Sequence, residues 1–264
     1  MRFITQKNSS ILREMVGTDF KVRYQGSILG YMWSFLRPLF LFLILYILFT
    51  KIFKVGKTVQ YYPVYLLLGI VLWNFFTEAT SNAMTSIVAR GDLIKKISIP
   101  KYLLIISSVS SAFINLILNL IIIFFISIFT KVPLGFGWFM IIPLSLELVI
   151  LALSLGFMLS TIFVKFRDLT YVWEVFIQAA FYATPILYPL SLITNVKFQK
   201  LLMINPVAQV IQDARYFLVT HQTIISWKIL SPIETTIPML IILIIAIPGI
   251  FYFKKQSKYF AENI

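Results

Sequence analysis

The sequence contains no cysteine, one histidine (His221) and few charged residues, and each shortage excludes a class of site. Without cysteine there is no disulfide or thiolate metal site, and one histidine cannot form a histidine cluster. Gly56-Lys57-Thr58 lacks the glycine that a phosphate-binding loop needs five positions earlier, where Lys51 stands. We find no dinucleotide fingerprint and no nucleophile elbow. The sequence therefore predicts no catalytic residue and no metal site.

Charged residues are scarce because much of the chain consists of long apolar runs. Asp, Glu, Lys and Arg make up 12 % of the sequence, whereas soluble domains contain about 25 %. No charged residue occurs in Tyr102–Thr130, Thr58–Thr77, Val175–Val196 or Thr235–Phe253. A helix of roughly 20 residues crosses the ~30 Å hydrocarbon core of a bilayer. With 59 % hydrophobic residues and a mean hydropathy of +0.90, the chain is predicted to be an all-α integral membrane protein.

The apolar runs predict six transmembrane helices, at about 33–54, 61–83, 102–130, 138–164, 172–190 and 234–253. Six spans place both termini on one side. Lys and Arg are enriched in the segments that a cytoplasmic N-terminus places inside, including Lys95, Lys96, Lys254 and Lys255. The net charge of +13 fits loops held against anionic membrane lipid better than a nucleic acid partner. We therefore expect a multi-pass membrane protein with both termini in the cytoplasm.

Two further segments are amphipathic without being long enough to span. Residues 9–24 place five apolar side chains on one helical stripe, which predicts an interfacial helix or, alternatively, a simple topological anchor. Residues 201–227 are apolar but are interrupted by Asn205-Pro206, which predicts re-entrant or surface-lying short helices on the outer face between spans five and six. We divide the chain into an interfacial helix with an entrance loop (1–32) and a transmembrane permease domain (33–264).

Ionisable side chains inside a membrane are candidates for function. Glu78 and Glu174 lie near predicted span ends, where hydration is the simpler explanation, and Glu147 has no basic partner in its own helix. These isolated acids do not form the relay that an ion-coupled carrier needs. The many aromatic residues could stack on sugar rings, although lipid contact or helix packing explains most of them.

Four stretches, in order along the chain, resemble the membrane (permease) subunit of type-2 ABC transporters that export lipid-linked polysaccharides such as O-antigen, teichoic acid and wall rhamnan. The stretches are Asp19-Phe20-Lys21-Val22-Arg23-Tyr24-Gln25-Gly26-Ser27 leading to Trp33-Ser34-Phe35-Leu36-Arg37-Pro38-Leu39; Arg90-Gly91-Asp92-Leu93-Ile94-Lys95-Lys96; Phe166-Arg167-Asp168-Leu169 with Thr184-Pro185-Ile186-Leu187-Tyr188-Pro189; and Asn205-Pro206. The sequence Ile99-Pro100-Lys101 departs from the aromatic-Pro-Arg found in many relatives.

The resemblance implies a homodimer in a bacterial plasma membrane that binds two ATP-binding cassette subunits. ATP and Mg would then be bound by those partners, and this chain would hold no cofactor. The substrate implied is an undecaprenyl diphosphate-linked polysaccharide exported from the cytoplasmic side. An ion-coupled flippase for lipid-linked sugars and an integral membrane transferase are the alternatives.

Three groups of functional residues are expected, the first two from the resemblance and the third from the polar and aromatic residues of span five. The entrance for the lipid diphosphate is matched by Arg23, Tyr24, Leu29 and Gly30. The segment that couples to the ATPase is matched by Asp92, Leu93, Ile94 and Ile97. The channel on the dimer axis is expected to be lined by span one and by span five, through Gln178, Phe181, Tyr182 and Tyr188. Arg23 can pair with a phosphate in two-point geometry, or alternatively with a lipid headgroup.

Overall fold

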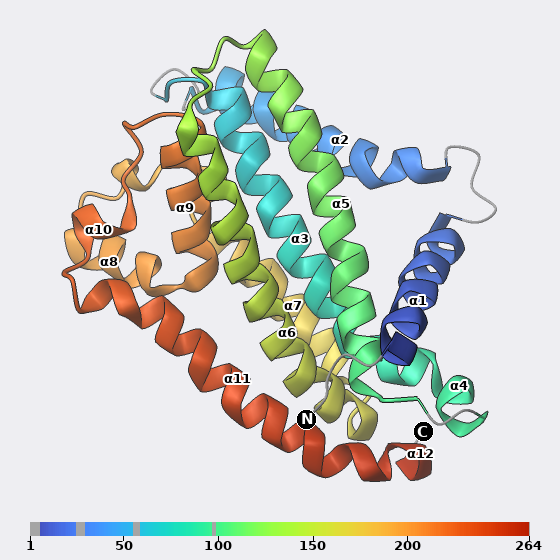
Figure 1. Ribbon diagram of the computed structural model, residues 1–264. Coiled ribbons are helices and arrows are strands. Elements are labelled where there is room, and N and C mark those ends of the chain that lie inside the picture. Colours follow the sequence, from blue (N-terminus) through green and yellow to red (C-terminus); the bar gives the residue numbers. More distant parts are fainter. Residues whose placement is uncertain (1–5, 25–29, 55–58, 97–98, 264) are drawn as a thin grey trace.

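The computed structural model describes residues 6–24, 30–54, 59–96 and 99–263, and every regular element in this part of the chain is a helix (Figure 1). The helices are α1 (Gln6–Tyr24), α2 (Trp33–Ile47), α3 (Tyr62–Ala89), α4 (Gly91–Lys96), α5 (Tyr102–Phe129), α6 (Ile141–Lys165), α7 (Leu169–Ala183), α8 (Val196–Ile204), α9 (Pro206–Leu218), α10 (Ser226–Ile229), α11 (Ile237–Gln256) and α12 (Phe260–Asn263). The all-α prediction is confirmed for the described residues.

Five helical segments of the described chain are long and apolar enough to cross a membrane. They are Trp33–Ile52, Tyr62–Ala89, Tyr102–Phe129, Phe136–Lys165 and Glu234–Tyr259. In the most apolar stretch of α3, 78 % of the residues are buried within the protein, against 6 % in α2. The helix α3 is therefore the centre of the bundle, and α2 leaves most of its surface uncovered.

Small residues allow the central helices to approach closely. A Cβ atom placed on Gly156 of α6 would lie 2.8 Å from Cβ of Ala83 in α3. On the other side of α6, a Cβ on Gly249 of α11 would lie 3.1 Å from the carbonyl oxygen of Ser154. Dispersion contacts of this kind hold helices together where lipid removes the hydrophobic driving force. The helices α3, α6 and α11 therefore form a closely packed row, and α5 packs against both α3 and α6.

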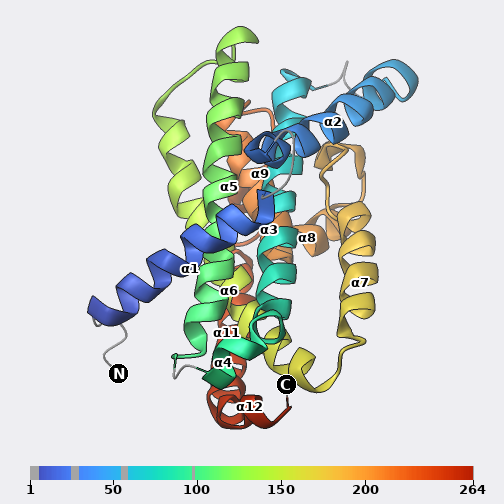
Figure 2. The same ribbon diagram turned by 90° about the vertical axis from the view of Figure 1, so that its right-hand side faces the viewer.

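The predicted fifth span, 172–190, is wrong as a continuous helix. The helix α7 has 15 residues, which corresponds to a length of about 22 Å, short of the ~30 Å hydrocarbon core. It ends because Thr184 precedes Pro185 and adopts an extended conformation (φ −83°, ψ 137°), as proline disfavours helical geometry in the preceding residue. Residues beyond this point form a compact turn, and α7 stands beside α3 (Figure 2).

The predicted short helices of residues 201–227 correspond to α9, with α8 and α10 next to it. The side chain of Asn205 begins α9 by accepting a hydrogen bond of 3.0 Å from the backbone N–H of Val207, and Pro206 occupies the first turn, where no N–H is needed. The helix packs against both α3 and α6. It is therefore an integral part of the bundle core and not a surface helix.

The N-terminal helix α1 lies obliquely against α5, as Figure 2 shows. Its predicted apolar residues Ile11, Leu12, Met15 and Val16 are half-buried, and Glu14 is exposed. Asn8 donates a hydrogen bond of 3.1 Å from its side-chain nitrogen to the hydroxyl of Tyr102. The apolar side of this helix therefore packs against the protein over at least part of its length. Its position in the membrane interface stays a prediction.

Candidate functional site

The expected entrance residues lie at the junction between α1 and α2. Arg23 and Tyr24 are the last two residues of α1, and their side chains lie outside the described part of the structure, as does Leu29. Gly30 has a φ of +47° at the start of the short turn before α2. Glycine adopts this left-handed conformation at no steric cost. The phosphate-binding role of this group stays a prediction.

The expected coupling residues lie on and after the short helix α4. Asp92 is exposed in its first turn, whereas Leu93 and Ile94 are half-buried and pack against the core of their own chain. Ile97 lies outside the described residues. The two apolar side chains therefore support the position of α4, in addition to any contact they make with a partner.

Charged residues on either side of α4 bind partners that are distant in sequence. Arg90, which immediately precedes α4, forms an ion pair with Asp19 of α1 and donates a hydrogen bond of 3.1 Å to the Ser107 hydroxyl. On the other side, Lys101 donates a hydrogen bond to the backbone carbonyl of Ser257 near the C-terminus. The N-terminal and C-terminal helices are thus both attached to the segment that contains α4.

The expected channel residues do not share one enclosed space within a single chain. Gln178 and Tyr182 are exposed on α7, whereas the ring of Phe181 packs edge-on against Trp73 of α3 with centroids 5.9 Å apart. Tyr188 lies beyond the helix end, and its hydroxyl donates to the carbonyl oxygens of Tyr182 and Ala183 at 3.5 Å each. Gln178 and Tyr182 are therefore available to a second copy or to lipid.

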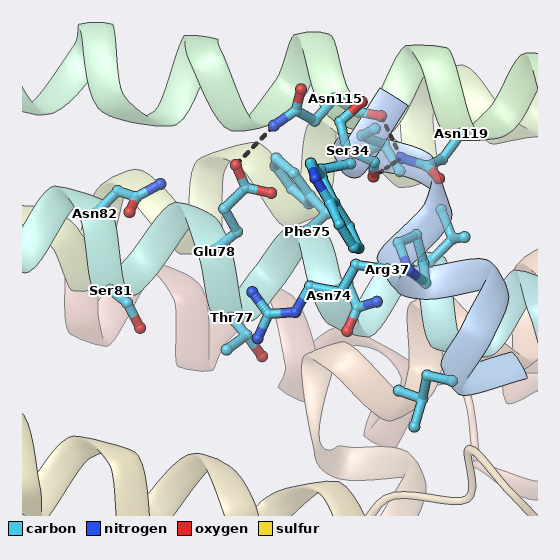
Figure 3. Close-up of a pocket in the computed structure, with 15 residues that line it drawn as sticks. Ser34, Arg37, Asn74, Phe75, Thr77, Glu78, Ser81, Asn82, Asn115 and Asn119 are labelled. Atoms are coloured by element: carbon cyan, nitrogen blue, oxygen red, sulfur yellow. Dashed lines mark hydrogen bonds between the residues drawn. The ribbon is translucent and has the colours of Figure 1, made fainter. Parts of the chain in front are cut away.

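The structure contains a polar cavity that was not predicted from the sequence. It has a volume of about 750 Å³ and lies between α2, α3 and α5 (Figure 3). We call it the polar cavity, and its polar lining consists of Ser34, Arg37, Asn74, Thr77, Glu78, Ser81, Asn82, Asn115 and Asn119. Polar side chains within membrane-spanning helices are energetically costly. A group of them therefore marks a candidate functional site.

Helical spacing places these side chains together. The polar residues of α3 recur at positions 74, 77, 78, 81 and 82, which is one face of a helix. Glu78 had been expected near the end of its span, but α3 continues to Ala89, so this carboxylate lies well within the helix. The polar stripe in an otherwise apolar span was the sequence signal for this site.

Hydrogen bonds fix part of the lining and leave another part without partners. Asn115 donates a hydrogen bond of 2.7 Å from its side-chain nitrogen to Glu78, and Asn119 donates one of 2.8 Å to the Asn115 backbone carbonyl. Three buried atoms, Thr77 Oγ1, Asn82 Nδ2 and Asn115 Oδ1, have no hydrogen-bond partner among the described residues. An unsatisfied buried group costs about 1–3 kcal/mol. Because these three atoms are fully buried, an occupant of the cavity does not reach them.

A second unexpected feature is the guanidinium of Arg215, which is fully buried. From α9 it donates hydrogen bonds to the carbonyl oxygens of Tyr65 at 3.0 Å, Pro185 at 2.6 Å and Ile186 at 2.5 Å. It also lies 3.7 Å from the centre of the Tyr65 ring. The sequence predicts that Arg215 lies in the short helices of the outer face, and in the structure it satisfies carbonyls of the turn where α7 ends.

Comparison with known proteins places these elements in one family. Residues 12–219, from α1 to the end of α9, match the family described as ABC-2 type transporter. Among curated proteins the chain is similar to an O-antigen export system permease protein RfbA of Klebsiella pneumoniae, with 29 % identity over 96 % of this chain and 94 % of the relative. It is also similar to the protein of that name from Myxococcus xanthus, with 27 % identity over 96 % of this chain and 95 % of the relative. The matches include the polar cavity, α4 and Arg215.

Proposed function

This chain belongs to the ABC-2 type transporter family, and we propose that it is the permease subunit of an ATP-driven exporter of undecaprenyl diphosphate-linked polysaccharide. As a membrane subunit of this family it is a transport component, and nucleotide binding lies in a separate ATPase subunit. The relatives from Klebsiella and Myxococcus, named as O-antigen export permeases, match this chain over nearly their whole length and support a polysaccharide substrate.

The observation that carries this proposal is the polar cavity. A permease that transported only apolar lipid would not need an arginine, a glutamate and four asparagines between its spanning helices. Each of these side chains must be hydrated or hydrogen-bonded, and burying it costs free energy. A polymer rich in hydroxyl groups needs such a lining along its path. The cavity is thus in keeping with a substrate that is lipid-linked at one end and hydrophilic over most of its length.

The proposed working unit is a homodimer with two ATPase subunits, with both termini in the cytoplasm. Exposed apolar side chains gather on α2, including Phe40, Leu43 and Ile44, and on α7, including Val175 and Phe176. Two copies that joined these faces would enclose a path along the dimer axis. The helix α7 and the turn after it would together act as the fifth of six spans, with α8–α10 toward the outer face.

An export assay tests the function directly. Deleting the gene for this chain should leave the polysaccharide inside the cell, and restoring it should return the polymer to the surface only with an ATPase partner that hydrolyses ATP. Surface polymer is measured with an impermeant lectin or antibody, and total polymer after lysis. Export that continues with a hydrolysis-deficient partner but stops when the ion gradient is dissipated would instead support the ion-coupled flippase.

The channel assignment gives a second expectation. Replacing Tyr182 by Ala should reduce export of long chains several-fold, because its ring is 63 % exposed and offers a stacking surface to sugars on the dimer axis. The control is Phe251→Ala, since Phe251 is also exposed, at 68 %, but lies on α11 and not on α7. Chain-length profiles of surface polymer, read on gels, provide the measurement. Normal profiles for Tyr182→Ala would remove α7 from the channel lining.

A further inference from the structure

We propose that the short helix α12 and the helix α4 form one composite surface on which the ATPase subunit docks. This inference rests on the proposed function, from which the ATPase partner and its contact with α4 are taken. It adds to that contact an element from the opposite end of the chain, since α12 follows the last spanning helix, α11. We call α4 together with residues 254–263 the composite surface.

The residue Lys101, between α4 and α5, connects the two parts of this surface. Its ammonium donates a hydrogen bond to the backbone carbonyl of Ser257, and Nζ lies 5.8 Å from the centre of the Phe260 ring. A cation at this distance from a ring centre is attracted by the ring. The helix α12 also packs directly against α4 and against α6. A partner that binds α4 therefore has α12 immediately beside it.

An aromatic side chain anchors α12 to the bundle. Phe260 is 1 % exposed, and its ring centre lies 5.5 Å from that of Phe253 in α11, edge to face. The ring of Phe253 in turn lies 5.1 Å from that of Phe157 in α6. Edge-to-face contacts of this kind are favourable. The position of α12 beside α4 is thus fixed within the chain, and a preformed surface loses little freedom when a partner binds.

The position of α12 at this end of the molecule makes contact with the partner difficult to avoid. Figure 1 and Figure 2 share a vertical axis, and in both views α12 lies lower than α4, at the end of the bundle where α4 is found. The helix α12 therefore projects further from the bundle than α4 does. An ATPase subunit that approaches this end to reach α4 meets α12 as well.

The exposed charges of the composite surface are mainly positive. Its exposed charged residues, among those that the structure describes, are the lysines Lys95, Lys96, Lys254, Lys255 and Lys258 and the acids Asp92 and Glu262. Interfaces between proteins bring opposite charges together. The surface therefore fits a partner whose facing side is rich in Asp and Glu. Anionic lipid headgroups would attract the same lysines, but the projection of α12 beyond α4 favours the ATPase.

Photo-cross-linking tests the contact. The photoreactive residue p-benzoyl-phenylalanine replaces Lys258 in the composite surface, Lys95 on α4 as a reference, or Phe251 as a control, which is 68 % exposed on α11 outside the surface. Each full-length protein is expressed with the ATPase subunit that restores export, and its membranes are irradiated. We expect adducts with the ATPase, detected with an antibody to it, at positions 95 and 258 and none above background at position 251.

A double charge reversal tests the electrostatic contribution. Lys255→Glu with Lys258→Glu should weaken binding of the ATPase subunit at least about tenfold at low salt, and the difference should shrink as salt screens the exposed charges. Both side chains are exposed, so the fold does not depend on them. Lys131→Glu with Lys197→Glu reverses two exposed lysines outside the surface and is the matched control. Affinity is measured between the purified full-length permease and the ATPase subunit.

The outcomes separate this inference from the proposed function. An ATPase adduct at position 95 without one at 258 would overturn the composite surface and leave the contact through α4 in place. Lipid as the sole product at position 258 would also overturn it and assign these lysines to the membrane surface. Failure of both positions to reach the ATPase would contradict the α4 contact of the proposed function as well. Unchanged affinity of the Lys255→Glu, Lys258→Glu variant would refute the electrostatic assignment.

Discussion

Replacing Arg215 by Met is expected to abolish recovery of folded protein. The substitution keeps a long side chain but removes all three hydrogen bonds to the carbonyls of Tyr65, Pro185 and Ile186. Hydrogen bonds donated by a charged group contribute about 1.5–3 kcal/mol each. The Pro185 carbonyl keeps a hydrogen bond of 3.3 Å from the Gln212 side chain, but the combined loss is still comparable with the whole stability of a typical protein, about 5–15 kcal/mol. Yield of monodisperse protein in detergent and its thermal unfolding midpoint measure the effect.

Three further variants make this test specific. Arg167→Met removes an exposed guanidinium and should leave the unfolding midpoint nearly unchanged. Gly69→Ala should reproduce part of the damage, because a Cβ at position 69 would overlap Nη2 of Arg215. Gly17→Ala is its control, since a Cβ there meets no atom within 4 Å. A normal unfolding midpoint for Arg215→Met would show that the turn after α7 is held by other contacts.

Reversing one charge of the Asp19–Arg90 pair is expected to reduce export at least about tenfold, and reversing both should restore most of it. The pair joins α1 to the residue from which α4 begins, and the backbone N–H groups of Leu93 and Ile94 both donate to the Arg90 carbonyl at 3.1 Å. Two like charges in contact at this partly buried site would repel each other strongly and displace α4. Export rate and ATPase activity of the complex are measured together.

The double-reversal design distinguishes a link between helices from general damage. Asp19→Arg and Arg90→Asp should each lower export, with ATP hydrolysis poorly coupled to transport, while the combined variant regains coupling. Glu14→Lys changes an exposed acid of α1 and serves as the control. A combined variant as defective as either single variant would show that the ion pair does not act as a unit.

The sequence by itself determined the membrane nature of this protein and five of its spanning helices. That success has a local cause, because a helix in lipid satisfies its own backbone and needs only about 20 consecutive apolar residues. The short helices after Asn205 were equally readable, since Asn205 and Pro206 act within one turn. Residues 12–219 match a known family, as the order of motifs predicted.

Only the tertiary structure decided where the polar residues meet. Glu78 gains its partner from α5, because Asn115 lies on a different helix. Arg215, which is expected among the short helices of the outer face, is buried in the core and donates to carbonyls contributed by α3 and by the turn after α7. These partners are far apart in the chain, so no local pattern contains them. Burial in lipid is a property of each segment, whereas the pairing of polar groups is a property of the packed bundle.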